Sequence, residues 1–90
     1  MEGEDTYIKT IATLETTVNT KKDNVLRASS RVSYERDMAV IDDSIKRMKT
    51  EVRKNPKNEA AKQILRNSYQ NKIELLNSVT ERSELMARLD

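Results

Sequence analysis

Apolar residues recur at helical spacing along this chain, most regularly in its middle. The clearest run has steps of four, three, four, three and four residues, which is the a/d seam of a heptad repeat. The run consists of Tyr34, Met38, Ile41, Ile45, Met48 and Val52. Because such a seam forms one narrow stripe on a helix, it predicts an amphipathic helix over residues 30–54.

A weaker pattern of the same kind lies near the N-terminus. Tyr7, Ile11, Leu14 and Val18 share one stripe, which predicts a helix over residues 4–22. Six Thr residues also fall in this segment, and β-branching lowers helix propensity by a few tenths of a kcal/mol per residue. We therefore expect this helix to need a packing partner. Residues that cap or interrupt helices predict a break before the next helix; they are Asp23, Asn24, Ser29 and Ser30.

The third predicted helix, over residues 59–88, has apolar positions spread over an arc of roughly 200°. The main ones are Ala61, Ile64, Leu65, Tyr69, Ile73, Leu75, Leu76, Val79, Met86 and Leu89. This arc is wider than one partner helix requires, so the helix packs on both preceding helices, or on the second helix and another subunit. Apolar positions left over are the candidate interface: Ile64, Leu75, Leu85, Leu89, Ile8 and Val40.

The strongest local signal is a turn at residues 54–59, between the second and third helices. Pro56 disfavours the α conformation at Asn55, which itself suits a left-handed position at a helix end. Asn58 can then cap the next helix, with Glu59 at its positive end. A turn this short returns the chain antiparallel. The sequence thus predicts an all-α domain over residues 1–90, a long, coiled-coil-like antiparallel helical hairpin with a shorter N-terminal helix.

Composition limits the chemistry that such a rod can carry. The 90 residues include neither Cys nor His, which removes thiolate nucleophiles, imidazole bases and the usual zinc ligands. We expect no enzymatic activity, no metal, no cofactor and no small-molecule substrate. Lys72 lies within the apolar arc, and we expect its ammonium to reach water at the edge of the hairpin. Two acid-before-base pairs predict a solvated back on the second helix, Asp42 with Lys46 and Asp43 with Arg47.

Charge and hydropathy give no sign of a nucleic-acid or membrane-spanning protein. The 17 basic and 15 acidic residues alternate along the chain, for a net charge of +2. A small basic cluster at residues 21–31 has acidic neighbours, so we do not expect nucleic-acid binding. No stretch approaches the roughly 18 consecutive apolar residues of a spanning helix. Membrane attachment would require a segment that is not present in this chain.

Three segments resemble a recurring bacterial pattern. They are the run from Tyr34 to Ile45, the turn from Asn55 to Glu59, and the run from Ser68 to Leu76. In this order and spacing they are similar to the C-terminal, extracytoplasmic helical region of membrane-anchored, zinc-finger-type anti-sigma factors. The likeness covers about residues 7–79.

This resemblance implies a periplasmic accessory or sensory domain of an inner-membrane transcription regulator. In that family the sigma-binding module carries a His/Cys zinc site. Because this chain has no His and no Cys, no zinc or sigma-binding residue can be carried over. The partner would be another protein or a second copy of this chain. The alternative is a free-standing cytoplasmic coiled-coil adaptor or scaffold, which would apply if Met1 is a native start.

Overall fold

The computed structural model describes the backbone of residues 1–89 and the side chains of residues 1–88. It contains three helices, α1 (Glu4–Val25), α2 (Ala28–Lys54) and α3 (Glu59–Leu89), and no strand among the described residues. The predicted all-α fold, with its shorter N-terminal helix and long hairpin, is confirmed.

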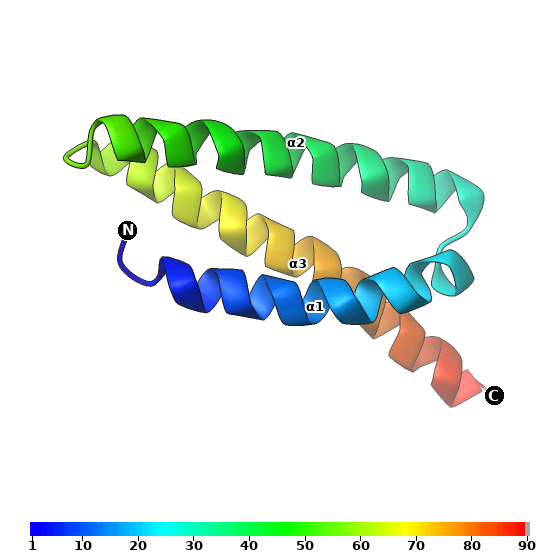
Figure 1. Cartoon of the computed structure of the whole chain (residues 1–90). Coiled ribbons are helices and arrows are strands. Elements are labelled where there is room, and N and C mark those ends of the chain that lie inside the picture. Colours follow the sequence, from blue (N-terminus) through cyan, green and yellow to red (C-terminus); the bar gives the residue numbers. More distant parts are fainter. Residues whose placement is uncertain (90) are drawn as a thin grey trace.

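The three helices are arranged around α3. Figure 1 shows α2 running antiparallel to α3, while α1 runs in the same direction as α3. Both α1 and α2 pack along α3, whereas they approach each other far less. Of the two alternatives for the wide apolar arc of α3, packing on both preceding helices is therefore what the chain adopts. The result is an elongated molecule of 51 × 24 × 16 Å.

The core lies along the axis of α3 and is contributed unequally by the helices. The most deeply buried large side chains are Leu65, Leu76 and Val79 of α3 and Val18 of α1. On α2 only Tyr34 is fully buried, and the rest of the heptad seam is partly buried. Such partial burial is expected for a narrow stripe in a thin bundle, because only one neighbour covers it.

The α2–α3 turn forms largely as predicted. The Asn58 side-chain oxygen accepts a hydrogen bond of 3.0 Å from the Ala61 N–H and so caps α3. The left-handed conformation predicted for Asn55 is wrong: its φ is −136° and its ψ is 85°. Pro56 explains the difference, because its ring favours extended conformations at the preceding residue.

The α1–α2 connection is shorter than predicted. α1 continues to Val25, beyond residue 22, and α2 begins at Ala28, ahead of residue 30. Only Leu26 and Arg27 are non-helical between them, and Leu26 is buried in the core. The position of this break thus depends on burial of a leucine, and the polar capping residues on either side do not set it.

Among the described residues, no helix has both the length and the apolar character needed to cross a membrane.

Candidate interaction groove between α2 and α3

A surface groove runs between α2 and α3. It consists of two adjoining hollows, with volumes of about 290 and 530 Å³, that share Asp37, Leu75 and Ser78 in their linings. We call this feature the α2–α3 groove. Its lining comes from α2, α3 and Leu26 of the α1–α2 connection, so α1 itself contributes no wall.

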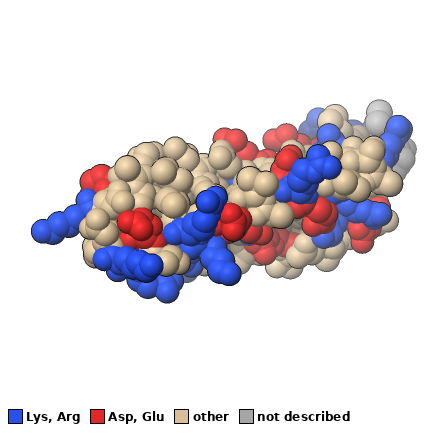
Figure 2. Space-filling model, turned by 90° about the horizontal axis from the view of Figure 1, so that it is seen from above, with Lys and Arg blue, Asp and Glu red and all other residues tan. Residues whose placement is uncertain are grey.

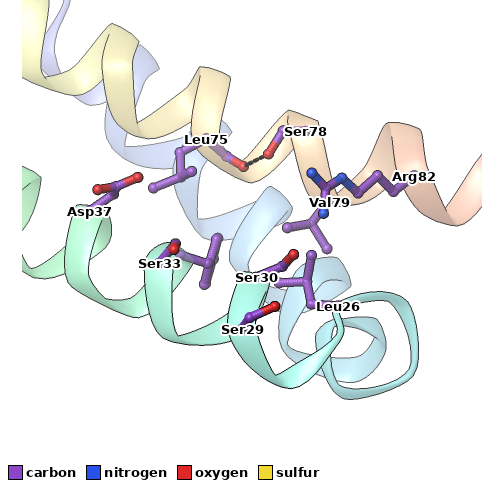
Figure 3. A pocket seen from close by; sticks show the side chains of 10 residues that line it. Leu26, Ser29, Ser30, Ser33, Asp37, Leu75, Ser78, Val79 and Arg82 are labelled. Carbon is purple, nitrogen blue, oxygen red and sulfur yellow. Dashed lines mark hydrogen bonds between the residues drawn. The ribbon is translucent and has the colours of Figure 1, made fainter.

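The end of the groove near the α1–α2 connection is lined by both polar and apolar side chains. Figure 3 shows three serines of the first turns of α2 facing Val79 and Arg82 of α3. These serines are Ser29, Ser30 and Ser33. On the α3 side of the groove, the Ser78 hydroxyl donates a 2.6 Å hydrogen bond to the Leu75 carbonyl of the same helix.

The other end of the groove is more apolar and lies open. Val40 and Ile41 of α2 face Leu75 of α3 there, with Asn71 and Glu74 at the rim. The Val40 side chain is 66% exposed, although valine is most often buried in folded proteins. Apolar side chains grouped inside a polar rim are typical of protein-binding surfaces.

The structure brings together some of the predicted interface residues. Val40 and Leu75 line the groove, and Leu75 also packs against the core. Ile64 is 46% exposed and lies eleven residues before Leu75, on the same face of α3. Leu85 is 58% exposed and lies ten residues after Leu75, rotated by about 80° around the helix at 100° per residue. Ile8, 43% exposed, lies apart in a hollow beside Ala12 of α1. The side chain of Leu89 lies outside the described residues.

The polar lining of the groove was missed in the sequence. Ser30, Ser33, Asp37, Val40 and Ser44 follow steps of three and four, so they form a second stripe beside the heptad seam of α2. Ser44 meets Ser68 of α3 at 2.9 Å between their hydroxyl oxygens. A stripe of small residues at helical spacing was thus the signal for this flank, and only its Val40 position was singled out.

Lys72 forms the main polar link among the helices. Its Nζ atom lies 3.1 Å from Glu15 of α1 and 2.6 Å from Asp42 of α2. The Lys72 side chain is partly buried, at 14% exposed, and access of its ammonium to water stays a prediction. The predicted pair of Asp42 with Lys46 does not form, because Asp42 binds Lys72 instead. Because Asp42 lies on the flank of α2 that faces α1, it meets the ammonium group that enters from α3.

The environment of Lys72 favours its charged form. Burial alone would lower the pKa of Lys72, but hydrogen bonds to Asp42 and Glu15, together with their negative charges, raise it above the ordinary value. The amine is therefore protonated at neutral pH. This state suits an ion pair that joins helices, whereas a nucleophilic amine needs a lowered pKa.

The remaining charges are distributed in pairs. Arg47 binds Asp43 at 3.0 Å, as predicted. Two residues of the basic cluster are paired as well, Lys22 with Glu35 at 3.0 Å and Arg31 with Asp23 at 3.1 Å. Figure 2 shows Lys and Arg interspersed with Asp and Glu over the face seen from above. No group of three or more acidic side chains close enough to hold a metal ion occurs within the described residues.

Comparison with known proteins adds no family to this description. No protein-family model, curated protein or solved structure matches the chain. The resemblance to anti-sigma factors rests on the sequence pattern alone.

Proposed function

We propose that this chain is a non-enzymatic protein-interaction domain that binds a protein partner along the α2–α3 groove. The observation that carries this proposal is the exposure of Val40, the most exposed of the large apolar side chains described, beside Leu75 in the groove. Leaving such side chains in water costs about 25 cal/mol for each Å² of apolar area, and a partner that covers them recovers this free energy.

Within this proposal, the chain is the extracytoplasmic part of a membrane-bound anti-sigma factor or a similar transcription regulator. The sequence resemblance supports this finer assignment, and the elongated bundle is compatible with it. In such a regulator, a partner in the groove would change the packing of α2 against α3. The movement would reach α1 through the Lys72 link to Glu15.

Site-specific photo-crosslinking in cells tests the groove as a binding surface. A photoreactive amino acid at position 40 should give a discrete covalent adduct with one protein. The matched control is position 46, where Lys46 is also exposed on α2 but lies about 120° around the helix, at 100° per residue. Mass spectrometry of the adduct identifies the partner, including a second copy of this chain.

The outcome at the two positions decides the proposal. An adduct at position 40 that disappears on Ile64→Glu substitution, with circular dichroism unchanged, supports binding along the α3 flank. Equal adducts at positions 40 and 46, or none at either, contradict the groove. An adduct with a protein outside any sigma-factor system retains the interaction function and rejects the anti-sigma assignment.

A further inference from the structure

The α1–α2 connection contains no residue that prevents a helix. The single Gly and single Pro of the chain are Gly3 and Pro56, both outside it. Arg27 stands at the cap position of α2 without making a side-chain capping bond, and the first turn of α2 has no acidic residue. The α2–α3 turn, in contrast, has Pro56 and the Asn58 cap. Tertiary packing, and not local sequence, therefore maintains the bend between α1 and α2.

α1 is attached to the rest of the molecule mainly through α3. Its packing partners lie along α3, with few approaches to α2. Two specific contacts join α1 to α3: Tyr69 donates to Glu4 at 2.7 Å, and Lys72 binds Glu15 at 3.1 Å. Near the α1–α2 connection, two exposed ion pairs also join α1 to α2, Lys22 with Glu35 and Arg31 with Asp23. Consequently, α1 can leave its own α3 only if it gains an equivalent one, and the α3 of a second copy is identical.

The directions of the helices allow such an exchange. α1 runs antiparallel to α2 and parallel to α3 (Figure 1). If residues 26 and 27 become helical, α1 and α2 form one continuous helix that places α1 beyond the end of its own hairpin. A twofold axis that passes near residues 26 and 27 places the hairpin of a second copy on the opposite side. The α3 helix of that copy runs toward the axis. The extended α1 runs parallel to this α3, as it does within one chain.

The end of α3 carries apolar side chains at the place where two such copies would meet. The last turns of α3 project past the α1–α2 connection (Figure 1). There Leu85 is 58% exposed and Met86 is 46% exposed. In an exchanged dimer this end would lie near the twofold axis, against the continuous helix of the other copy. Burial there would stabilise the dimer relative to two separate chains.

We propose that two copies of this chain form a dimer by reciprocal exchange of α1, with Leu26 and Arg27 as the hinge. Exchange of an identical element is a low-cost route to a symmetric dimer, because the contacts of the closed chain are re-formed between chains. The exchange goes beyond the proposed function, since it would take place whether or not the α2–α3 groove binds a partner.

Arg27→Pro separates the closed chain from the exchanged dimer. In the closed chain Arg27 has φ −66°, Leu26 is extended with ψ 128°, and the Arg27 N–H has no acceptor among the described residues. Proline fits all three conditions. In a continuous helix the same proline would clash with the carbonyl of Asp23. Because each exchanged dimer contains two such helices, we expect the dimer association constant to fall roughly ten-thousandfold. Arg27→Ala, which also removes the guanidinium but permits a helix, should dimerise like the wild type.

The measurement is the solution mass by light scattering after refolding at a series of concentrations. All three chains should be equally helical by circular dichroism, with dimers in the wild type and in Arg27→Ala only. A wild-type chain that remains monomeric over a hundredfold range of concentration overturns the proposal. Equal dimer fractions in Arg27→Pro and Arg27→Ala overturn it as well.

Cross-linking distinguishes exchange from simple surface association. Unlabelled and ¹⁵N-labelled chains are mixed, unfolded and refolded together, and a carbodiimide then couples Lys72 to Glu15 across their 3.1 Å ion pair. Exchange predicts coupled peptides that combine both labels in the dimer fraction, and same-label peptides alone in the monomer fraction. Dimers that yield only same-label peptides retain α1 within each chain and refute the exchange.

Discussion

Tyr69 shows how one residue combines apolar packing with a polar contact. Its ring stacks on that of Tyr7, with centroids 5.4 Å apart and an angle of 14° between planes. Its hydroxyl donates a 2.7 Å hydrogen bond to Glu4 near the start of α1. Burial raises the pKa of Tyr69, and the hydrogen bond and negative charge of Glu4 raise it further.

The raised pKa of Tyr69 predicts a loss of stability at alkaline pH. The folded chain holds the phenol proton more tightly than the unfolded chain, where the pKa is about 10. The stabilisation is thus complete below about pH 10 and is lost as the pH rises from there toward the folded pKa. Urea unfolding followed by circular dichroism should show this fall, and Tyr69→Phe should reduce it. The pKa values of Tyr34 and Lys72 are also raised, so Tyr69→Phe should still show a smaller loss of stability at alkaline pH.

Tyr7→Phe is the matched control for this prediction. It keeps an aromatic ring against Tyr69 and leaves the hydrogen bond to Glu4 in place, removing only the contact of Gln70 with the Tyr7 hydroxyl. The loss of stability of Tyr7→Phe at alkaline pH should match that of the wild type. An equal fall in Tyr69→Phe would show that the phenol of Tyr69 does not determine the pH dependence.

At the scale of elements, apolar spacing predicted more than polar side chains did. The heptad seam correctly identified the side of α2 that faces α3, because the periodicity of one helix is a local property. The partner of Asp42 could not be found in this way. It depends on which flank of the hairpin α1 occupies, and the residues that determine this, Glu15 and Lys72, are far apart in the chain.

The two breaks between helices also differ in whether they depend on local sequence or on tertiary packing. Pro56 and Asn58 act on backbone groups within three residues of themselves, so the α2–α3 turn was predictable. Leu26 acts by insertion into a core that exists only after the bundle forms. The α2–α3 groove was predictable only in part. Its serine stripe was visible in the spacing, but the hollow depends on how α3 crosses it.

The Lys72 link predicts how firmly α1 is attached to the hairpin. Lys72→Met retains the apolar stem but leaves Glu15 and Asp42 without their cation. Both carboxylates are roughly half exposed, so solvent screens them, and we expect a loss of about 1 kcal/mol in the free energy of unfolding. Lys46→Met removes an exposed charge from α2 and should change stability by much less. Equal losses in the two variants by urea unfolding at low salt would rule out a structural role for the ion pairs.

For the whole molecule, the position of α3 makes α1 essential to the fold. Leu65, Tyr69, Leu76 and Val79 are each at most 3% exposed, although α2 covers only one side of α3. Taking α1 away would open the other side, including Tyr69, which stacks on Tyr7. A hairpin of two helices then has little enclosed core, and chains this small have little stability in reserve.

Residues 28–90 alone should therefore lose cooperative unfolding, because the hairpin cannot bury both sides of α3. Adding a peptide of residues 1–25 in trans should restore a cooperative transition in thermal circular dichroism, since α1 packs mainly on α3. A peptide with Val18→Glu should not restore it, because Val18 is 1% exposed, whereas Thr10→Glu at an exposed position should. If residues 28–90 unfold with the same free energy as the full chain, α2 and α3 form a self-sufficient unit and α1 serves only as a cover. Restoration by the peptide would instead show that α1 can be supplied by another molecule, which exchange between two copies requires.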